Sequence, residues 1–132
     1  AGNDKATVVT DTGVISDDIL RRIDDTTLLV LEANYDPHML RFGPYQPFLK
    51  QRVASDEGHL SNEMAAQALL MMKRPNFMQV ILAHRSENNN NAVLVTQTIG
   101  KMLVDGGVRI GPEMKLQHGQ PNEIVSIQSV KR

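Results

Sequence analysis

The chain has 132 residues, of which 22% are charged, and its formal net charge is −1 at pH 7. This composition is that of one small globular domain, and any basic surface on it must be local. The sequence has no cysteine, which excludes disulfides and thiolate metal sites and leaves histidine and carboxylates as metal ligands. No apolar run approaches the length of a membrane span, so we expect no membrane contact and a cytoplasmic location.

The first predicted strand covers residues 6–10 and is followed by Asp11 and, two places later, Gly13. Asp and Gly directly after a strand are typical of a tight turn. Asp11 is therefore a turn residue, a side chain that caps the next helix, or a functional group at the end of a strand. Ser16 then offers an N-cap for a helix that extends to about Ile23.

The second predicted strand covers residues 26–31, a run whose apolar part has no polar break and is typical of burial on both faces. It ends at Glu32, and a carboxylate so close to a core must be paired or hydrogen-bonded. Residues 42–47 contain one Gly and two Pro and predict a loop, and residues 48–54 predict a short helix. Lys50 and Arg52 in that helix, with Tyr45 nearby, either contact a phosphate or a base or are solvated surface.

A strong helix is predicted over residues 64–73, with Ser61 or Asn62 as its N-cap. His59 lies two or three residues ahead of this helix start. Helix N-termini attract anions, although a lone histidine in such a place is more often structural.

The apolar stretch of residues 78–83 predicts a buried strand that ends at His84. Four consecutive asparagines follow at residues 88–91, and their side chains both donate and accept hydrogen bonds. Two interpretations remain open here. Either His84 and the asparagines line a site at the carboxyl end of a strand, or they form a solvated turn.

A further helix is predicted over residues 92–104 and ends at a double glycine. Short strands or edges are predicted at 108–110 and 123–130. His118 lies in a turn-like sequence and receives no role. The order of these elements predicts an α/β fold with at least four strands.

Asp11, Glu32 and His84 each follow a predicted strand, and His59 precedes a helix. If the strands are neighbours, these groups converge at one edge of the sheet. Aspartate and histidine there are suitable ligands for zinc or manganese-like ions, and a spare His and Glu could transfer a proton.

Six short motifs occur in one order along the chain: Thr-Asp-Thr-Gly at 10–13, Leu-Glu-Ala-Asn-Tyr-Asp at 31–36, Gly-Pro-Tyr at 43–45, Leu-Lys-Gln-Arg-Val at 49–53, Gly-His-Leu-Ser-Asn at 58–62 and Leu-Ala-His-Arg-Ser at 82–86. In this order they resemble the YycJ/WalJ-type hydrolases of the metallo-β-lactamase fold, which are metal-dependent phosphodiesterases similar to DNA exonucleases. The resemblance covers about residues 6–110.

The resemblance implies roles for the residues that match its motifs. Asp11 corresponds to the aspartate that bridges two divalent metal ions, zinc or manganese, and His84 corresponds to the last metal-ligand histidine. Glu32 and His59 resemble the Glu–His pair with which related tRNA-processing enzymes protonate the leaving oxygen. The resemblance places six further residues along the substrate pocket: Ser61, Asn62, Ser86, Asn88, Asn89 and Asn90.

The family's fold consists of two similar halves packed face to face, and its first half carries His-x-His-x-Asp-His. No two of the four histidines here have that spacing. We therefore expect residues 1–132 to be the C-terminal half of the αββα sandwich, a sheet with helices on one face. An exposed inner face predicts that this half pairs with the missing N-terminal half, with another chain or with itself as a homodimer.

The leading hypothesis is thus a fragment of a dinuclear-metal enzyme that cleaves phosphodiester bonds in nucleic acid, with the isolated chain inactive. One alternative is a non-catalytic, dimerising interaction module derived from the same fold. Another is a hydrolase of this fold that acts on a thioester or a lactone.

Overall fold

The structure is a computed structural model, and it describes residues 4–55, 58–83, 86 and 89–119. The strands in this part of the chain are β1 (Ala6–Val9), β2 (Leu28–Glu32), β3 (Met78–Ala83) and β4 (Met114–His118). The helices are α1 (Asp17–Ile23), α2 (Pro37–Phe42), α3 (Pro47–Ala54), α4 (Asn62–Met71) and α5 (Ala92–Asp105).

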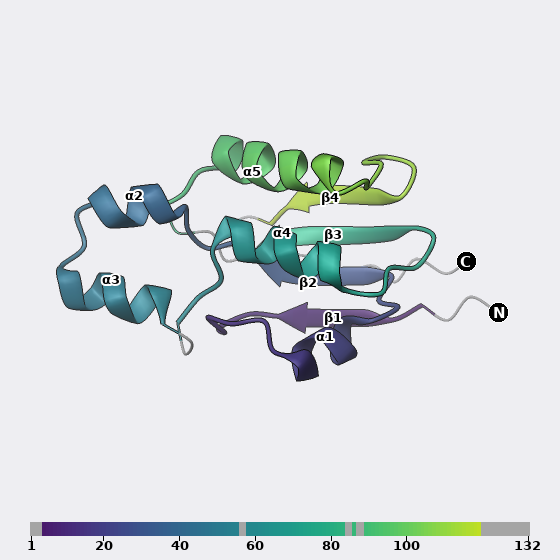
Figure 1. The fold of residues 1–132 in the computed structure, drawn as a ribbon, viewed down its shortest axis with the longest axis horizontal. Helices are drawn as coiled ribbons and strands as arrows, with labels where there is room; N and C mark the ends of the chain where they lie inside the picture. The colour runs from purple at the N-terminus through teal and green to yellow at the C-terminus, as the bar shows by residue number, and fades with distance from the viewer. Residues whose placement is uncertain (1–3, 56–57, 84–85, 87–88, 120–132) are drawn as a thin grey trace.

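The four strands form one parallel sheet in the order β1-β2-β3-β4 (Figure 1). The register aligns Val9 with Leu31 and Leu31 with Leu82, so the first three strands end side by side. This arrangement confirms the predicted α/β fold class. It also brings the segments that follow β1, β2 and β3 to one end of the sheet, where ligands bind in open α/β sheets.

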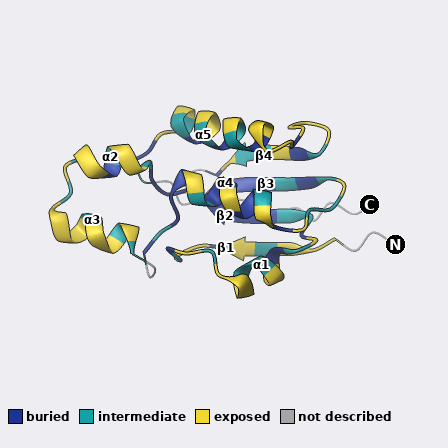
Figure 2. Cartoon of the chain, in the orientation of Figure 1, coloured by how far each residue is buried: buried dark blue, intermediate teal, exposed yellow. Residues whose placement is uncertain are grey.

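One face of the sheet shares a single hydrophobic core with α1, α4 and α5. The strands contribute alternate residues such as Leu29, Leu31, Val80 and Leu82, as expected for side chains that point to opposite faces in turn. Alanines of α4 allow that helix to lie close to the sheet, and Figure 2 shows the resulting burial. The core thus fixes the strand ends, from which the candidate site is built.

Several helices begin at side-chain caps that the sequence supplies. Ser16, Asp36, Ser61 and Asn91 each accept a hydrogen bond from a backbone N–H in the first turn of the helix that follows. The predicted N-caps of α1 and α4 are confirmed, and Asn91 has a capping role. None of the helices among the described residues is long and apolar enough to cross a membrane.

The prediction was wrong for the fourth strand. Residues 108–110 contribute only an isolated bridge from Ile110 to Met114. The fourth strand, β4, lies instead at Met114–His118, where no strand was predicted and where His118 was assigned to a turn-like sequence. Val108 instead packs into the core after α5. The predicted strand at 123–130 lies outside the described residues.

Candidate active site

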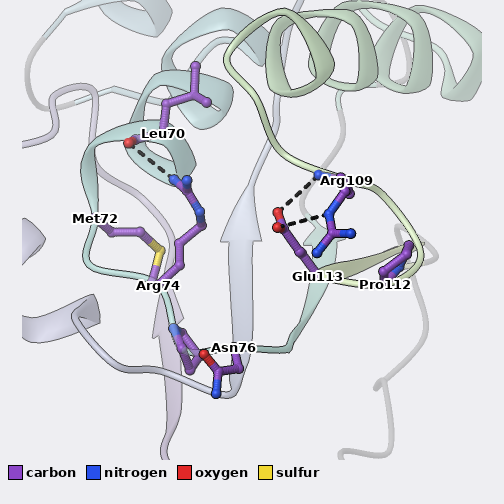
Figure 3. Close-up of a pocket in the computed structure, with 8 residues that line it drawn as sticks. Leu70, Met72, Arg74, Asn76, Arg109, Pro112 and Glu113 are labelled. Atoms are coloured by element: carbon purple, nitrogen blue, oxygen red, sulfur yellow. Dashed lines mark hydrogen bonds and ion pairs between the residues drawn. The ribbon is translucent and has the colours of Figure 1, made fainter.

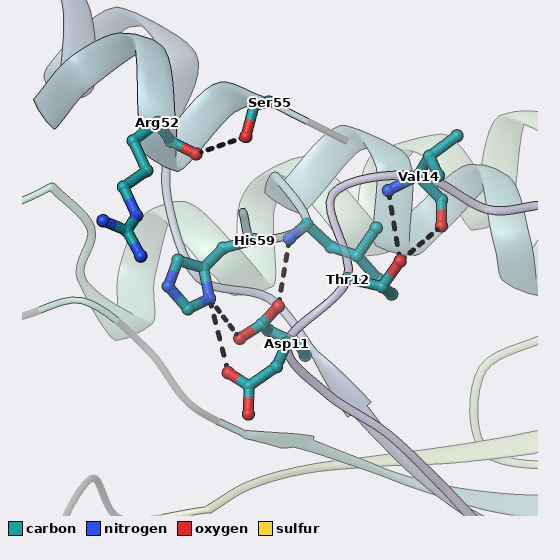
Figure 4. Close-up of polar contacts among 8 residues, drawn as sticks. Asp11, Thr12, Val14, Arg52, Ser55 and His59 are labelled. Atoms are coloured by element: carbon teal, nitrogen blue, oxygen red, sulfur yellow. Dashed lines mark hydrogen bonds and ion pairs between the residues drawn. The ribbon is translucent and has the colours of Figure 1, made fainter. Parts of the chain in front are cut away.

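Asp11 lies two residues beyond β1, in a turn where its backbone adopts the left-handed conformation. Its φ is 57°, a conformation that Asp and Asn tolerate better than other non-glycine residues. The hydroxyl of Thr12 donates to the carbonyl of Val14 at 2.9 Å and braces this turn (Figure 4). The Asp11 side chain is 73% exposed and faces His59.

Glu32 is the last residue of β2, and its side chain is fully buried. Its Oε2 accepts a hydrogen bond from the backbone N–H of Leu60 at 3.0 Å, and its Oε1 lies 2.9 Å from Nδ1 of His59. Both carboxylate oxygens therefore have partners. The expectation that a carboxylate at this position must be hydrogen-bonded is confirmed.

His59 is placed by the backbone on either side of it. Its N–H donates to the carbonyl of Val53 at the end of α3, and two further backbone hydrogen bonds run from Asn34 N–H to Leu60 and from Asn62 N–H to Tyr35. Residues 59–62 thus run beside 33–35, which extend β2.

Gly58 permits the close approach of α3 to His59. A Cβ at position 58 would lie 2.2 Å from the carbonyl oxygen of Arg52 and 2.3 Å from that of Val53. No side chain fits between backbone atoms at that distance, so glycine is required here for packing rather than for a left-handed backbone.

Asp11, Glu32 and His59 form one cluster, although the sequence separates them widely. Asp11 Oδ1 lies 3.8 Å from His59 Nδ1, and one potential ligand atom from each residue lies within 4.8 Å of the others. A pocket of about 260 Å³ opens on this cluster, and it is also lined by Leu49, Arg52 and Val53 of α3. The cluster combines a buried, oriented carboxylate with an imidazole and an accessible carboxylate. Acid–base and metal-assisted catalytic centres contain these groups.

Three of the predicted pocket-lining residues make structural contacts. The Ser61 hydroxyl caps α4, and the side-chain amides of Asn62 and Asn90 exchange hydrogen bonds of 2.9 and 2.8 Å. Asn90 also donates to the carbonyl of Ala33 at 3.0 Å. All three side chains are buried, so a contact with substrate stays a prediction for them.

Ser86 and Asn89 form part of the loop after β3. The N–H of Ser86 donates to the carbonyl of Asn34 at 2.8 Å, and the Ser86 hydroxyl accepts from the N–H of Asn89. Neither polar atom of the buried Asn89 side chain has a hydrogen-bond partner among the residues that the structure describes. The predicted site residues His84 and Asn88 lie outside the described residues.

The donors fit a metal ion only in part. Both oxygens of Glu32 already accept hydrogen bonds, from His59 and Leu60, so only part of their accepting capacity remains for an ion. Asp11 is open to solvent and its carboxylate suits zinc or manganese. Asp11 is therefore the described residue best placed to hold an ion, and Glu32 is better suited to orienting His59.

Sequence reasoning missed two features of this site. The first is that Asp11 faces the His59 ring itself, because the predicted convergence at one edge of the sheet did not say which side chains meet. The second is the wall that Leu49, Arg52 and Val53 contribute to the pocket. A partial signal existed, since the basic residues of α3 were already candidates for contact with phosphate.

The fold and the cluster define an α/β protein with a candidate acid–base centre at the carboxyl ends of its parallel strands. The chain is 34% identical over 128 residues to exodeoxyribonuclease YycJ of Bacillus anthracis, a match that covers 97% of this chain and 48% of the relative. It is 35% identical over 121 residues to exodeoxyribonuclease WalJ of Streptococcus pneumoniae serotype 2, covering 91% of this chain and 45% of that protein. No protein-family model and no solved structure gives a significant match.

These similarities confirm the predicted resemblance to YycJ/WalJ-type proteins. The chain spans about half the length of the curated relatives it matches. The chain is homologous to the part of each relative that it matches. These relatives imply the metallo-β-lactamase fold for the α/β sheet of this chain.

Proposed function

We propose that the chain is the C-terminal half of a metal-dependent hydrolase that cleaves phosphodiester bonds in nucleic acid, as an exonuclease does. The nuclease class rests on the names of the relatives, which are exodeoxyribonucleases. The assignment to one half of a longer protein rests on the share of those relatives that the chain covers and on the absence of His-x-His-x-Asp-His from its sequence. The protein is proposed to work in the cytoplasm.

The observation that carries this proposal is the contact of His59 with the buried Glu32. The 2.9 Å hydrogen bond at Nδ1 orients the imidazole, as a carboxylate does in many general acid–base pairs. In hydrolysis, a water oxygen bonds to phosphorus and the bond from phosphorus to the leaving oxygen breaks. His59 supplies the proton that the leaving oxygen takes up. The attacking water releases a proton, which returns the centre to its starting protonation state.

Two divalent metal ions would complete the centre in the intact enzyme. Asp11 and His84 would hold them from this chain, together with ligands from the missing half. Ions bound there supply the activation of water and the stabilisation of charge on the phosphoryl oxygens. Because one half provides so few ligands, this chain alone is expected to bind zinc weakly and to be inactive.

The missing ligands imply a partner for this half, either its own N-terminal half or a second chain. On the sheet face away from the helical core, Val8 of β1 is 59% exposed and is consistent with a partner there. Val30 and Ile81, its neighbours on β2 and β3, are buried, so the expected exposed apolar face is limited to its edge among the described residues. The sequence alone leaves a homodimer as the alternative to a covalent partner.

The proposal is tested on the product of the complete reading frame, which we expect to contain His-x-His-x-Asp-His upstream of this chain. His59→Ala should lower kcat on labelled DNA by about 10²- to 10⁴-fold, because the leaving oxygen loses its proton donor. Glu32→Gln places an amide opposite Nδ1, selects the other tautomer and should alter the pH profile as well as the rate. The matched control is Glu113→Gln, the same substitution at the opposite end of the sheet.

Full activity of His59→Ala would remove the proposed acid from the mechanism. A purified protein that forms a discrete dimer without metal and hydrolyses no DNA would instead favour the interaction-module alternative. Hydrolysis of a thioester or lactone but not of DNA would favour the other enzyme class.

A further inference from the structure

The two short helices between β2 and the site form a distinct surface, which we call the helical arm (residues 37–55). The arm comprises α2, α3 and the loop that joins them, and Figure 1 shows it beyond the carboxyl ends of the strands. It contributes little to the core. Leu40 is the only buried residue of α2, and α3 has none. Figure 2 shows both helices as largely exposed, so folding alone does not explain the choice of residues here.

The charge of the helical arm differs from that of the whole chain. Residues 37–55 contain Arg41, Lys50 and Arg52 and no aspartate or glutamate, although the chain has a formal net charge of −1. The arm is therefore a local basic surface on an otherwise slightly acidic protein. Such a surface attracts a polyanion and adds a salt-dependent term to its binding.

Aromatic rings are concentrated on the same surface. The chain has five phenylalanines and tyrosines, of which Phe42, Tyr45 and Phe48 lie in the helical arm. Phe42 is 68% exposed and Phe48 is 64% exposed, whereas Tyr35 next to the site is buried. Two large apolar rings in water are unfavourable unless something covers them, and the adjacent positive charges argue against a purely apolar partner.

The Phe42 ring is held in place by its neighbours on α2. The Phe42 ring lies 4.7 Å from the His38 ring, centroid to centroid, and the Arg41 guanidinium lies 5.5 Å from its centroid. Lys50 Nζ donates to the carbonyl of Arg41 at 2.7 Å and ties α3 to α2. Stacking of aromatic rings interleaved with cations is the composition of surfaces that bind single-stranded nucleic acid.

The helical arm is continuous with the candidate active site. Leu49, Arg52 and Val53 line the pocket of about 260 Å³ whose other walls include Asp11 and His59. The backbone bond from His59 N–H to the carbonyl of Val53, 2.9 Å long, fixes the end of α3 against the catalytic candidate. A strand lying on the arm would therefore end at His59.

We propose that the helical arm binds single-stranded DNA and guides the end of that strand into the active site. Phe42 and Phe48 stack on unpaired bases, and Arg41, Lys50 and Arg52 contact the phosphates. This inference rests on the proposed nuclease function and makes it more specific, because bases in a duplex do not present their faces to a ring. The substrate is a strand with unpaired terminal nucleotides.

The test measures fluorescence anisotropy of a labelled twelve-residue oligothymidylate and of a blunt twelve-base-pair duplex. The protein is the complete reading-frame product, with EDTA present to prevent cleavage. Phe42→Ala with Phe48→Ala should weaken binding of the single strand by at least tenfold, since a stacked base contributes about 1–3 kcal/mol. Binding of the duplex should change by less than twofold.

The matched control replaces two exposed apolar residues outside the arm, Val93→Ala with Val104→Ala on α5, and should leave both affinities unchanged. The double substitution Arg41→Gln and Arg52→Gln should weaken the binding of both DNA forms. It should also reduce the slope of log affinity against log salt concentration by about one to two units, since fewer ions are released on binding. Arg21→Gln with Arg22→Gln on α1 is the matched charge control.

Equal affinity of the parent and the double phenylalanine variant for the single strand would overturn the inference. A change of that variant from dimer to monomer in light scattering, without a change in DNA affinity, would assign the rings to contact with a second copy instead. Hydrolysis of bis(p-nitrophenyl) phosphate separates the two proposals, because Phe42 and Phe48 do not line the pocket in which this small diester would react. Loss of that activity in His59→Ala supports the proposed function whatever the arm binds.

Discussion

The chain has polar pockets at both ends of its sheet, and they are built differently. The larger one, about 490 Å³, lies at the amino ends of β3 and β4 and includes Arg74, Arg109 and Glu113 (Figure 3). The smaller one, about 260 Å³, contains Asp11 and His59. Size alone would favour the larger pocket as a functional site.

The charged groups of the larger pocket are explained by local structure. Arg109 bonds Glu113 four residues away through both its backbone N–H and its Nε, and Arg74 donates to the carbonyls of Leu69 and Leu70 at the end of α4. These are partners that a turn and a helix end require in any case.

The cluster of Asp11, Glu32 and His59 has no such local explanation. Its members come from three separate segments, and the Glu32 side chain is fully buried, whereas Glu113 remains 35% exposed. Bringing a carboxylate into a core has a cost that a surface ion pair does not have. The energetic cost of burying Glu32 and the assembly of the cluster from three distant segments therefore identify this site better than pocket volume does.

The largest expected effect concerns Asp11, in the smaller of the two pockets. In the complete reading-frame product, Asp11→Asn should reduce metal-dependent cleavage of DNA to background and lower the zinc content after dialysis, because an amide is a poor substitute for a metal-binding carboxylate. Asparagine tolerates the left-handed backbone at φ 57°, so the fold should be retained.

Asp25→Asn is the matched control for that experiment. Asp25 also has a left-handed backbone, with φ 60°, and it lies at the opposite end of β2, where Lys73 is its partner at 3.7 Å. It should keep both activity and zinc. Retained cleavage in Asp11→Asn would remove Asp11 from the metal centre.

A second prediction concerns how the backbone places His59. Gly58→Ala should lower the free energy of unfolding by about 1–3 kcal/mol, because its Cβ would overlap the carbonyl oxygens of Arg52 and Val53. The α3 helix would have to move away from His59, so kcat should fall with stability in denaturation and activity measurements.

Gly100→Ala is a control for which the opposite change in the free energy of unfolding is expected. Gly100 lies inside α5, where the only contact of an added Cβ is Ile110 Cδ1 at 3.9 Å. Alanine should therefore stabilise this helix by about 0.5–1 kcal/mol and leave activity unchanged. Destabilisation by both substitutions would show that the approach at Gly58 has no special role.

The sequence predicted the parts of the structure that depend on local pattern. The apolar runs gave β2 and β3, and Ser16 and Ser61 marked the starts of α1 and α4. The convergence of strand ends followed from the α/β order. The strand at Met114–His118 was missed because it is short and because a glycine and a proline follow it closely, at positions 119 and 121.

The use of the asparagines could not be predicted from the sequence. Asn90 and Asn62 are 28 residues apart, and only the fold reveals that they bond each other beneath the site. Asn91 caps α5, and the described asparagines of the run therefore include structural residues. A polar composition indicates capacity for hydrogen bonds but does not say whether the partner is substrate or backbone.

A third prediction tests this distinction at the Asn62–Asn90 pair. Asn62→Ala should lower the free energy of unfolding by about 1–3 kcal/mol, since it leaves the buried Asn90 amide without one partner. With Asn90→Ala, a double-mutant cycle should give a coupling energy of about 0.5–3 kcal/mol. Asn76→Ala, exposed in the larger pocket, should change stability by less than about 0.5 kcal/mol. Unchanged stability with weakened DNA binding would instead favour substrate contact.

The smallest expected effect belongs to the larger pocket and concerns Glu113. The pKa of Glu113 is lowered from its ordinary value of 4.5, first by the backbone N–H of Arg109 and then by the Arg109 side chain. A carboxylate with a lowered pKa in the folded state stabilises the fold above pH 4.5, and this contribution is lost as the pH falls through the folded-state pKa. Glu113→Gln should therefore be slightly less stable than the parent at pH 7 and equal to it in strong acid.

Arg109→Gln separates the two causes of that shift. Because the backbone N–H remains in this variant, the pKa of Glu113, measured by NMR titration of its carboxyl carbon, should stay below 4.5 but rise towards it. A return to the ordinary value would mean that the guanidinium, and not the turn, holds the carboxylate. The larger pocket would then contain an independent ion pair rather than a by-product of backbone geometry, and the contrast with the Asp11, Glu32 and His59 cluster would be weaker.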